Sequence, residues 1–391
     1  ITTGTNGIFT FLTVPVGTNT MLKPQKNIDV NNGVSTLDMI ILRKHILTIE
    51  SLNSPYKYIA ADVNKDNKLS TADLVELRKI ILLQQTTFQN NESWRFINSN
   101  YQFSNTGNPL LEPFLEYYSI NNIKTNNLKV DFKGIKIGDL DDSAKPNSII
   151  GSDERTANGD LVFEIKDQWL KAGQTYRIAF LSKDFNNISG FQQTIKFDKN
   201  RLTINDVNQG ILPDFGVAQN NLSNLNEGYI LQSWDYDRNI TLENGYPLFT
   251  IEITAKEECE LSKALYISTE HIRAEAYEYI DQYETNVYQT KINWIGTDKS
   301  STSQSQFELF QNKPNPFSNE TIIGYQVPED NEILFQLLDH TGKLIYQAKK
   351  ASMKGYNEIN LTNELLKQSG VYTYKIISNG YTSSKKMMFL R

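Results

Sequence analysis

The chain is poor in cysteine and histidine and has no long apolar run. Its 391 residues include one cysteine, Cys259, so no disulfide can form within the chain, and its stability must come from packed cores and bound metal. No stretch approaches the roughly 20 apolar residues that a membrane-spanning helix needs. Because the sequence opens at Ile1 without a start methionine or a signal peptide, we expect the C-terminal part of a longer protein.

The charge balance argues against a nucleic-acid-binding protein. The net charge is −6 and the pI is about 5.4, so the chain lacks the basic surface that phosphates require, and an acidic balance suits cations instead. With 21% charged and 39% hydrophobic residues, the composition is that of soluble globular modules, and the length predicts two to four of them.

Catalytic signals are scarce. The three histidines, His45, His271 and His340, lie far apart in the chain, and no Gly-x-Ser-x-Gly nucleophile motif occurs. Carboxylates in residues 235–237 and 275–284 could in principle form an acid–base pair. Surface hairpins rich in Tyr, Asp and Glu explain them more simply, so we predict that this chain is not an enzyme.

A repeat with an offset of 35 residues is the first positive signal. Residues 35–47 align with residues 70–82, and both copies place apolar residues near i, i+3, i+4 and i+7. Each copy therefore predicts an amphipathic helix that follows an oxygen-rich loop. Two such helices can bury their apolar stripes against each other.

The second loop, residues 62–73, has the spacing of a calcium loop. Oxygen ligands fall at loop positions 1, 3, 5, 7 (a main-chain carbonyl), 9 and 12, which suits a hard cation that takes six to eight oxygens. These positions are Asp62, Asn64, Asp66, Lys68, Ser70 and Asp73. The alternative is an Asp/Asn-rich turn that only caps the following helix.

The first loop, residues 27–38, is a weaker version of the same pattern. Its candidate ligands are Asn27, Asp29, Asn31, Gly33, Ser35 and Asp38. A neutral asparagine stands at position 1, so this loop either binds calcium more weakly or keeps its shape without metal.

Paired loop–helix units of this kind resemble a type I dockerin. The resemblance implies two calcium half-sites and a helix face on which Ser/Thr and Lys/Arg dock onto a cohesin. The matching residues are Ser35, Thr36, Arg43, Lys44, Ser70, Thr71, Arg78 and Lys79. Helix N-caps and solvated helix faces are the alternative roles for these residues.

Residues 131–142 follow as a closing segment. We expect a strand that latches onto the helix pair, and Asp139 is a candidate metal ligand because Gly138-Asp139-Leu140-Asp141 resembles the start of another calcium loop, although no loop of full length follows. Asp142-Ser143-Ala144 matches the short O-glycosylation pattern of Bacteroidetes, with Ser143 as the acceptor. An unmodified loop is the simpler alternative.

Residues 151–297 predict an all-β sandwich. Alternating segments such as 161–165, 175–181, 190–197, 229–234, 248–254 and 264–267 indicate many strands separated by turns. Residues 185–198 and 247–251 resemble a cohesin-like jelly roll. Such a module beside a dockerin-like one suggests either an intrachain contact or chain-to-chain assembly into a homo-oligomer.

Residues 307–391 predict a small antiparallel sandwich of six strands, at 321–327, 334–338, 344–347, 357–361, 371–377 and 386–390. A plain immunoglobulin-like module would explain these strands. The order of the motifs is more specific, and it resembles the type A C-terminal sorting domain of proteins exported by the type IX secretion system of Bacteroidetes-type bacteria. The residues that carry this resemblance are Asn315, Pro316, Phe317, Gly342, Gly355, Gly370, Tyr372, Lys385 and Lys386.

The sequence therefore predicts a mainly β, multi-domain protein with a small α-helical calcium module. The predicted parts are residues 1–24, the last strands of a preceding β-sandwich of the carboxypeptidase-regulatory-like type, then 25–148, 149–297, a linker at 298–306, and 307–391. We expect a secreted structural or adhesive protein at the outer-membrane surface, with the type IX machinery as a partner. The alternative is the generic tail of a secreted hydrolase or carbohydrate-binding protein whose active domain lies upstream.

Overall fold

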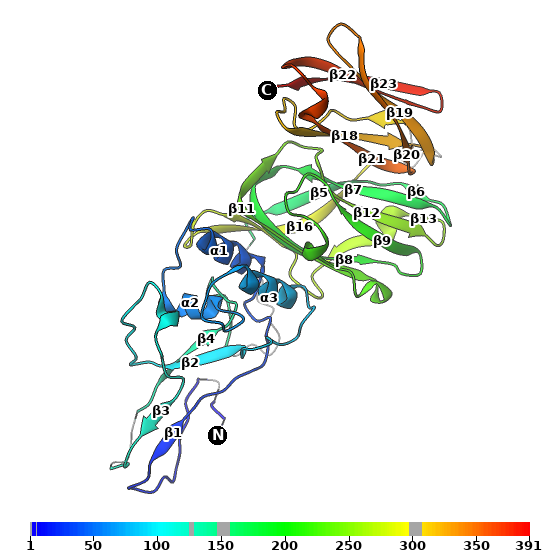
Figure 1. Cartoon of the computed structure of the whole chain (residues 1–391). Helices are drawn as coiled ribbons and strands as arrows, with labels where there is room; N and C mark the ends of the chain where they lie inside the picture. The colour runs from blue at the N-terminus through cyan, green and yellow to red at the C-terminus, as the bar shows by residue number, and fades with distance from the viewer. Residues whose placement is uncertain (1, 5, 125–128, 147–156, 297–306) are drawn as a thin grey trace.

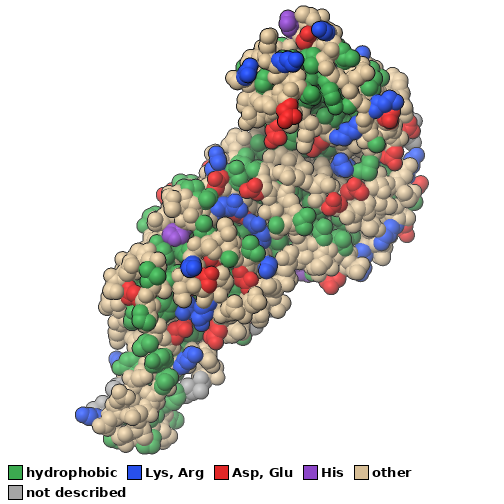
Figure 2. Space-filling model, viewed as in Figure 1, with side chains coloured by type: hydrophobic (Ala, Val, Ile, Leu, Met, Phe, Trp, Pro, Cys, Tyr) green, Lys and Arg blue, Asp and Glu red, His purple; other side chains and the backbone are tan. Residues whose placement is uncertain are grey.

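The computed structural model describes residues 2–4, 6–124, 129–146, 157–296 and 307–391. It is mainly β, and three lobes follow one another in line, with the two termini at opposite ends (Figure 1). On the face shown in Figure 2, acidic and basic side chains are interspersed over this elongated outline. Among the described residues, no helix is both long enough and apolar enough to cross a membrane.

The first lobe packs three helices against short strands. The helices are α1 (Thr36–Ile46), α2 (Pro55–Ala61) and α3 (Thr71–Ile81); the strands are β1 (Thr20–Leu22), β2 (Trp94–Asn98), β3 (Tyr118–Ile120) and β4 (Phe132–Lys136). The repeat correctly predicts α1 and α3. Ser35 and Ser70 are their N-caps, and each forms a capping box with the aspartate three residues later. The sequence pattern does not predict α2, because its seven residues are too few to show a helical period.

The two small sheets of this lobe join distant segments. β1 pairs antiparallel with β3, so the strand formed within the described part of residues 2–24 finds a partner in the following module. β2 pairs antiparallel with β4, which confirms that residues 131–142 contribute a closing strand.

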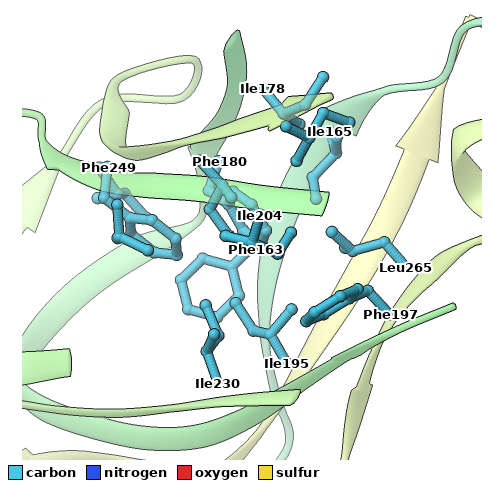
Figure 3. Close-up of a cluster of buried hydrophobic side chains, with 14 of the residues drawn as sticks. Phe163, Ile165, Ile178, Phe180, Ile195, Phe197, Ile204, Ile230, Phe249 and Leu265 are labelled. Atoms are coloured by element: carbon cyan, nitrogen blue, oxygen red, sulfur yellow. The ribbon is translucent and has the colours of Figure 1, made fainter. Parts of the chain in front are cut away.

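The second lobe is a β-sandwich. Its strands are β5 (Asp160–Lys166), β6 (Trp169–Leu170), β7 (Thr175–Lys183), β8 (Phe185–Phe197), β9 (Leu202–Gln209), β10 (Asn220–Asn221), β11 (Tyr229–Leu242), β12 (Pro247–Ala255), β13 (Cys259–Glu260), β14 (Leu265–Ser268), β15 (Glu275–Tyr279) and β16 (Thr285–Ile295). β8 lies between β11 and β15, and β16 continues from β15 into β5 through a parallel pairing. Aromatic and aliphatic side chains from both layers meet in one core (Figure 3).

The third lobe confirms all six strands predicted for residues 307–391. They are β18 (Glu320–Val327), β19 (Asn331–Leu338), β20 (Leu344–Ser352), β21 (Gly355–Thr362), β22 (Gly370–Ser378) and β23 (Tyr381–Phe389), preceded by the short β17 (Glu308–Leu309). The lobe has its own core, which includes Phe335, Tyr325 and Tyr374. β21 also bridges to β7 at Gly355 and Arg177, so the third lobe adjoins the sandwich edge.

We expect Phe191→Ala to destabilise the sandwich by about 3 to 5 kcal/mol, because it leaves a cavity in a close-packed core. Phe191 is fully buried, and its ring contacts those of Phe163, Trp234 and Phe249. Urea unfolding followed by tryptophan fluorescence measures the loss. Tyr266→Ala, at a side chain that is 53% exposed on β14, is the control and should change stability by less than about 0.5 kcal/mol. Equal effects of the two substitutions would contradict the assigned core.

Candidate functional site

Hydrogen bonds from backbone N–H groups to two of its aspartates, Asp62 and Asp73, close the loop at residues 62–73. Asp62 accepts hydrogen bonds from the backbone N–H of Asp66 (3.0 Å) and of Asn67 (3.2 Å). Asp73 accepts from Asn64 N (3.2 Å) and from Ser70 N (2.9 Å), which ties both ends of the loop together. Asn67 adopts a left-handed backbone with φ of 64°, as position 6 requires. All six sequence-predicted ligands are thus in one turn of chain.

The charges of this loop suit a dication. Asp62 and Asp73 are fully buried. Burial raises the pKa of Asp62 to about 6 against the opposing effect of the Asn67 and Asp66 N–H groups, and burial also raises the pKa of Asp73. Two buried carboxylates beside an amide oxygen, a hydroxyl and a main-chain carbonyl are the donor set that calcium prefers, so the residues present fit the metal.

The first loop is split between exposed and buried residues. Asn27, Asp29 and Asn31 are exposed, and Asn27 Oδ1 accepts a hydrogen bond from the backbone of Ser93 (2.9 Å). Asp38, at position 12, is fully buried.

Gly33 and Ser35, the other two predicted ligands of this loop, are also buried. The N-terminal half of the first loop is therefore exposed, and its C-terminal half is buried.

The closing segment lies against Asp38. Carboxylate oxygens of Asp38, Asp139 and Asp141 come within 4.8 Å of one another. Burial, and then the neighbouring Asp141, raise the pKa of Asp139. Lys136 is buried beside them, and its Nζ donates to the carbonyls of Val30 and Ile137, both at 2.8 Å. The sequence singled out Asp139 but not Asp141, because the loop they begin is not continued in the chain.

Ser143, the predicted glycosylation acceptor, is built into this contact. Its Oγ donates to the carbonyl of Gly33 at 3.0 Å, and the side chain is half-buried. Its glycosylation stays a prediction, and a glycan would have to displace this hydrogen bond.

A second site lies where α1 and α3 meet the sandwich. Asp235 on β11 is fully buried and accepts a hydrogen bond from Arg43 Nε at 2.6 Å. Its other carboxylate oxygen pairs with Arg78 Nη2. Arg43 and Arg78 occupy the same position in the two copies of the repeat, so one carboxylate holds both helices.

Polar and apolar contacts extend this docked face along α1. Thr36 N donates to Gln192 Oε1 (2.8 Å), and the Thr36 and Ser233 hydroxyls lie 2.7 Å apart. Gly190 on β8 allows the close approach, since a Cβ there would come within 2.9 Å of Ile40 Cδ1.

Two further contacts lie at the helix ends. Asn221 Nδ2 donates to the Leu82 carbonyl (2.7 Å), and the Tyr279 hydroxyl donates to Glu50 (2.7 Å).

The docking residues suggested by the sequence divide into two groups. Thr36, Arg43 and Arg78 contact the sandwich, whereas Ser35 and Ser70 act as N-caps. On α3, Thr71 is exposed and Lys79 faces Glu76 at 4.0 Å. Lys44 lies over the ring of Tyr279 at 4.8 Å.

In the sequence, Asp235 stands out only as a candidate acid–base residue. The structure gives it a pairing role that no local pattern signals.

The sorting-signal residues are partly structural. Phe317 is buried and packs on Phe389, and its N–H donates to the Met388 carbonyl (3.0 Å). Asn315 Oδ1 accepts from Met388 N (2.7 Å). The Pro-Asn-Pro-Phe motif is therefore fastened to the last strand of the chain.

The remaining sorting-signal residues serve turns, packing or the surface. Gly342 and Gly355 take left-handed backbones, with φ of 85° and 99°. The buried Tyr372 donates to the Gln368 carbonyl (2.6 Å), and Gly370 begins β22. Lys385 is half-buried and Lys386 is exposed on β23. A surface groove of about 430 Å³ runs between Pro314, Pro316 and Leu390.

Two family models match the chain. The type I dockerin domain matches residues 25–82, and the secretion system C-terminal sorting domain matches residues 314–389. No curated protein matches.

Solved structures similar to the chain include cohesins. The seventh ScaB type I cohesin of Pseudobacteroides cellulosolvens is 13% identical with a TM-score of 0.26, covering 34% of this chain and 88% of that one. The third cohesin ScaC of Acetivibrio cellulolyticus, in complex with the ScaB dockerin, is 15% identical with a TM-score of 0.22, covering 35% and 99%.

A surface component of the type IX secretion system, PorZ of Porphyromonas gingivalis, is 18% identical with a TM-score of 0.18, covering 30% of this chain and 15% of that one. All these TM-scores are too low to carry an argument. The family models carry the assignment: the chain is a secreted modular protein with a type I dockerin domain and a C-terminal sorting domain of the type IX secretion system.

Proposed function

We propose that this chain is a structural segment of a cell-surface protein, in which the dockerin helices are held by the chain's own sandwich. The observation that carries the proposal is the fully buried Asp235, which pairs with Arg43 and Arg78. A helix pair fixed in this way works as a rigid joint between modules. It does not serve as a free docking arm.

The covered face supports an intrachain role. Thr36, Met39 and Ile40 of α1 are fully buried in the docked arrangement. Another protein could use this face only by displacing β8 and β11, and that would leave Asp235 without its two guanidinium partners. Separating buried ionic partners costs several kcal/mol, so the intrachain contact has the advantage.

Calcium would stiffen this joint through the loop at 62–73. Asp62, Asn64, Asp66, Ser70 and Asp73, with the Lys68 carbonyl, would hold the ion. When bound, the ion supplies positive charge to a cluster of buried carboxylates. Asp73 also completes the capping box of α3 with the N-cap Ser70, so the loop positions the helix that carries Arg78.

A structural role also accounts for the groups that could have been catalytic. Asp235 is paired with two arginines, and Glu278 accepts hydrogen bonds from Asn286 (2.9 Å) and Tyr288 (2.8 Å). His271 stacks on Tyr229 at 3.9 Å. The contacts of Asp235 and Glu278 use the carboxylate oxygens that acid–base chemistry would need.

The sorting domain would direct export by the type IX machinery to the surface of a Bacteroidetes-type cell. Phe317 and Asn315 hold the Pro-Asn-Pro-Phe motif against β23. A partner could therefore read the motif and the exposed Lys386 of β23 as one surface.

We expect Asp235→Asn to lower the free energy of unfolding by about 3 to 5 kcal/mol, because two guanidinium groups lose their buried counter-charge. Hydrogen exchange should show α1 and α3 opening first. Asp237→Asn is the matched control, since Asp237 pairs with Arg238, whose side chain is 70% exposed, and it should change stability by less than about 1 kcal/mol. An unchanged unfolding curve for Asp235→Asn would remove the proposed joint.

Chelation of calcium should loosen residues 27–82 before the sandwich. The expected loss is roughly 2 to 4 kcal/mol when free calcium exceeds the dissociation constant by about 100- to 1,000-fold. Asp62→Asn should reproduce part of this loss, whereas Asp160→Asn, at an exposed carboxylate of β5, should not. Thermal melting with and without chelator measures it, and identical curves would exclude a structural metal.

Deletion of residues 307–391 should leave the other modules folded, because the sandwich has a separate core, but should keep the protein inside the cell. Surface labelling of intact cells measures display. The control is Lys349→Ala on β20, where Lys349 forms an exposed ion pair with Glu332 of β19, and this variant should be displayed normally. Normal display of the deletion would contradict the sorting role.

A further inference from the structure

We propose that the first calcium half-site is a split loop, built from two segments that are far apart in the chain. Residues 139–144 supply loop positions 1 to 6, and residues 33–38 supply positions 7 to 12. The ligands would be Asp139, Asp141, Ser143, the Gly33 carbonyl, Ser35 and Asp38. This inference depends on calcium as the dockerin's metal, but it does not depend on occupancy of the loop at 62–73.

The loop at residues 62–73 provides an internal template for position 1. There, Asp62 Oδ1 accepts from the N–H of position 5 (3.0 Å) and Oδ2 from the N–H of position 6 (3.2 Å). In the split loop, Asp139 Oδ1 accepts from Ser143 N (3.1 Å) and Oδ2 from Ala144 N (3.0 Å). The two aspartates therefore have the same role in the two turns.

Positions 3 and 12 repeat the template as well. Asp38 Oδ1 accepts from Asp141 N (3.3 Å), as Asp73 Oδ1 accepts from Asn64 N (3.2 Å). Asp38 Oδ2 accepts from Ser35 N (2.8 Å), the counterpart of the bond between Ser70 N and Asp73 Oδ2 (2.9 Å). The correspondence thus holds across both segments, although they are distant in the sequence.

The backbone takes the same left-handed conformation at position 4, where Asp142 has a φ of 61° and Lys65 of the template has a φ of 60°. At position 6 the two turns differ, because Asn67 is left-handed and Ala144 is not. Where the two segments meet, a Cβ on Gly33 would lie 2.6 Å from Ala144 Cα, so only glycine permits this close approach.

Two hydrogen bonds hold the two segments together next to this contact. Asn32 accepts one from Lys145 N (3.0 Å) and donates one to the Lys145 carbonyl (2.7 Å).

The donor set fits the metal better than the continuous segment 27–38 does. The split loop offers three carboxylates whose oxygens lie within 4.8 Å of one another. The sequence of the template also supplies three carboxylates, Asp62, Asp66 and Asp73. By contrast, Asn27, Asp29 and Asn31 are exposed, and Asn27 Oδ1 already accepts from Ser93 N.

The test is the calcium stoichiometry of the full chain, measured by native mass spectrometry and by titration calorimetry after removal of metal. We expect two ions per wild-type chain, one in Asp139→Asn, one in Asp62→Asn, and none in the double variant. Asp142→Asn is the matched control at the exposed, non-ligand position 4 and should keep two. Asp29→Asn should also keep two, because the continuous loop is not the site.

Each outcome is decisive. A single ion that is lost in Asp62→Asn but kept in Asp139→Asn would mean that Lys136 closes the half-site without metal, and the inference would be overturned. Loss of an ion in Asp29→Asn would overturn it in favour of the continuous loop. A single ion that is lost in Asp139→Asn and kept in Asp62→Asn would support the split loop while removing the loop at 62–73. If Asp139→Asn does not fold, Asp141→Asn takes its place.

Discussion

The ion triad of Asp235, Arg43 and Arg78 is the constraint on which the arrangement of the first two lobes depends. A fully buried carboxylate is tolerated only when its charge is compensated at close range, and here two guanidinium groups approach from two helices. Because the arginines are equivalent residues of a repeat, the pairing fixes both helices at once. Asp235 of β11 therefore helps to set the orientation of the dockerin on the sandwich, together with the contacts of Thr36 and Glu50.

The calcium loops and the docked face are mechanically connected through the helix starts. Asp38 and Asp73 are each the third residue of a helix, and each also stands at position 12 of a loop. Thr36, the residue after the N-cap of α1, faces the sandwich, and so does Arg78, about two turns into α3. A cation that orders the loops would therefore order the helices that carry the interface.

Short-range patterns in the chain predicted much of the fold. The helices at 36–46 and 71–81 follow from the apolar period of 3.6 residues and from their capping boxes, and the strands of the last lobe follow from alternation between turns. The helix at 55–61 and the strand at 285–295 were not predicted. The helix is too short to show a helical period. The parallel pairing of that strand with β5 depends on a register between residues more than a hundred positions apart.

Local patterns in the chain specify the loop at 62–73 with its oxygen spacing, the caps at Ser35 and Ser70, and the order of the sorting motifs. Contacts between distant residues appear only once the modules are packed together. Arg43 and Asp235 are 192 positions apart, and Asp38 and Leu140 are 102 apart. No periodicity connects such residues, because the free energy that brings them together comes from burying the surfaces of whole modules rather than from the preferences of neighbouring residues.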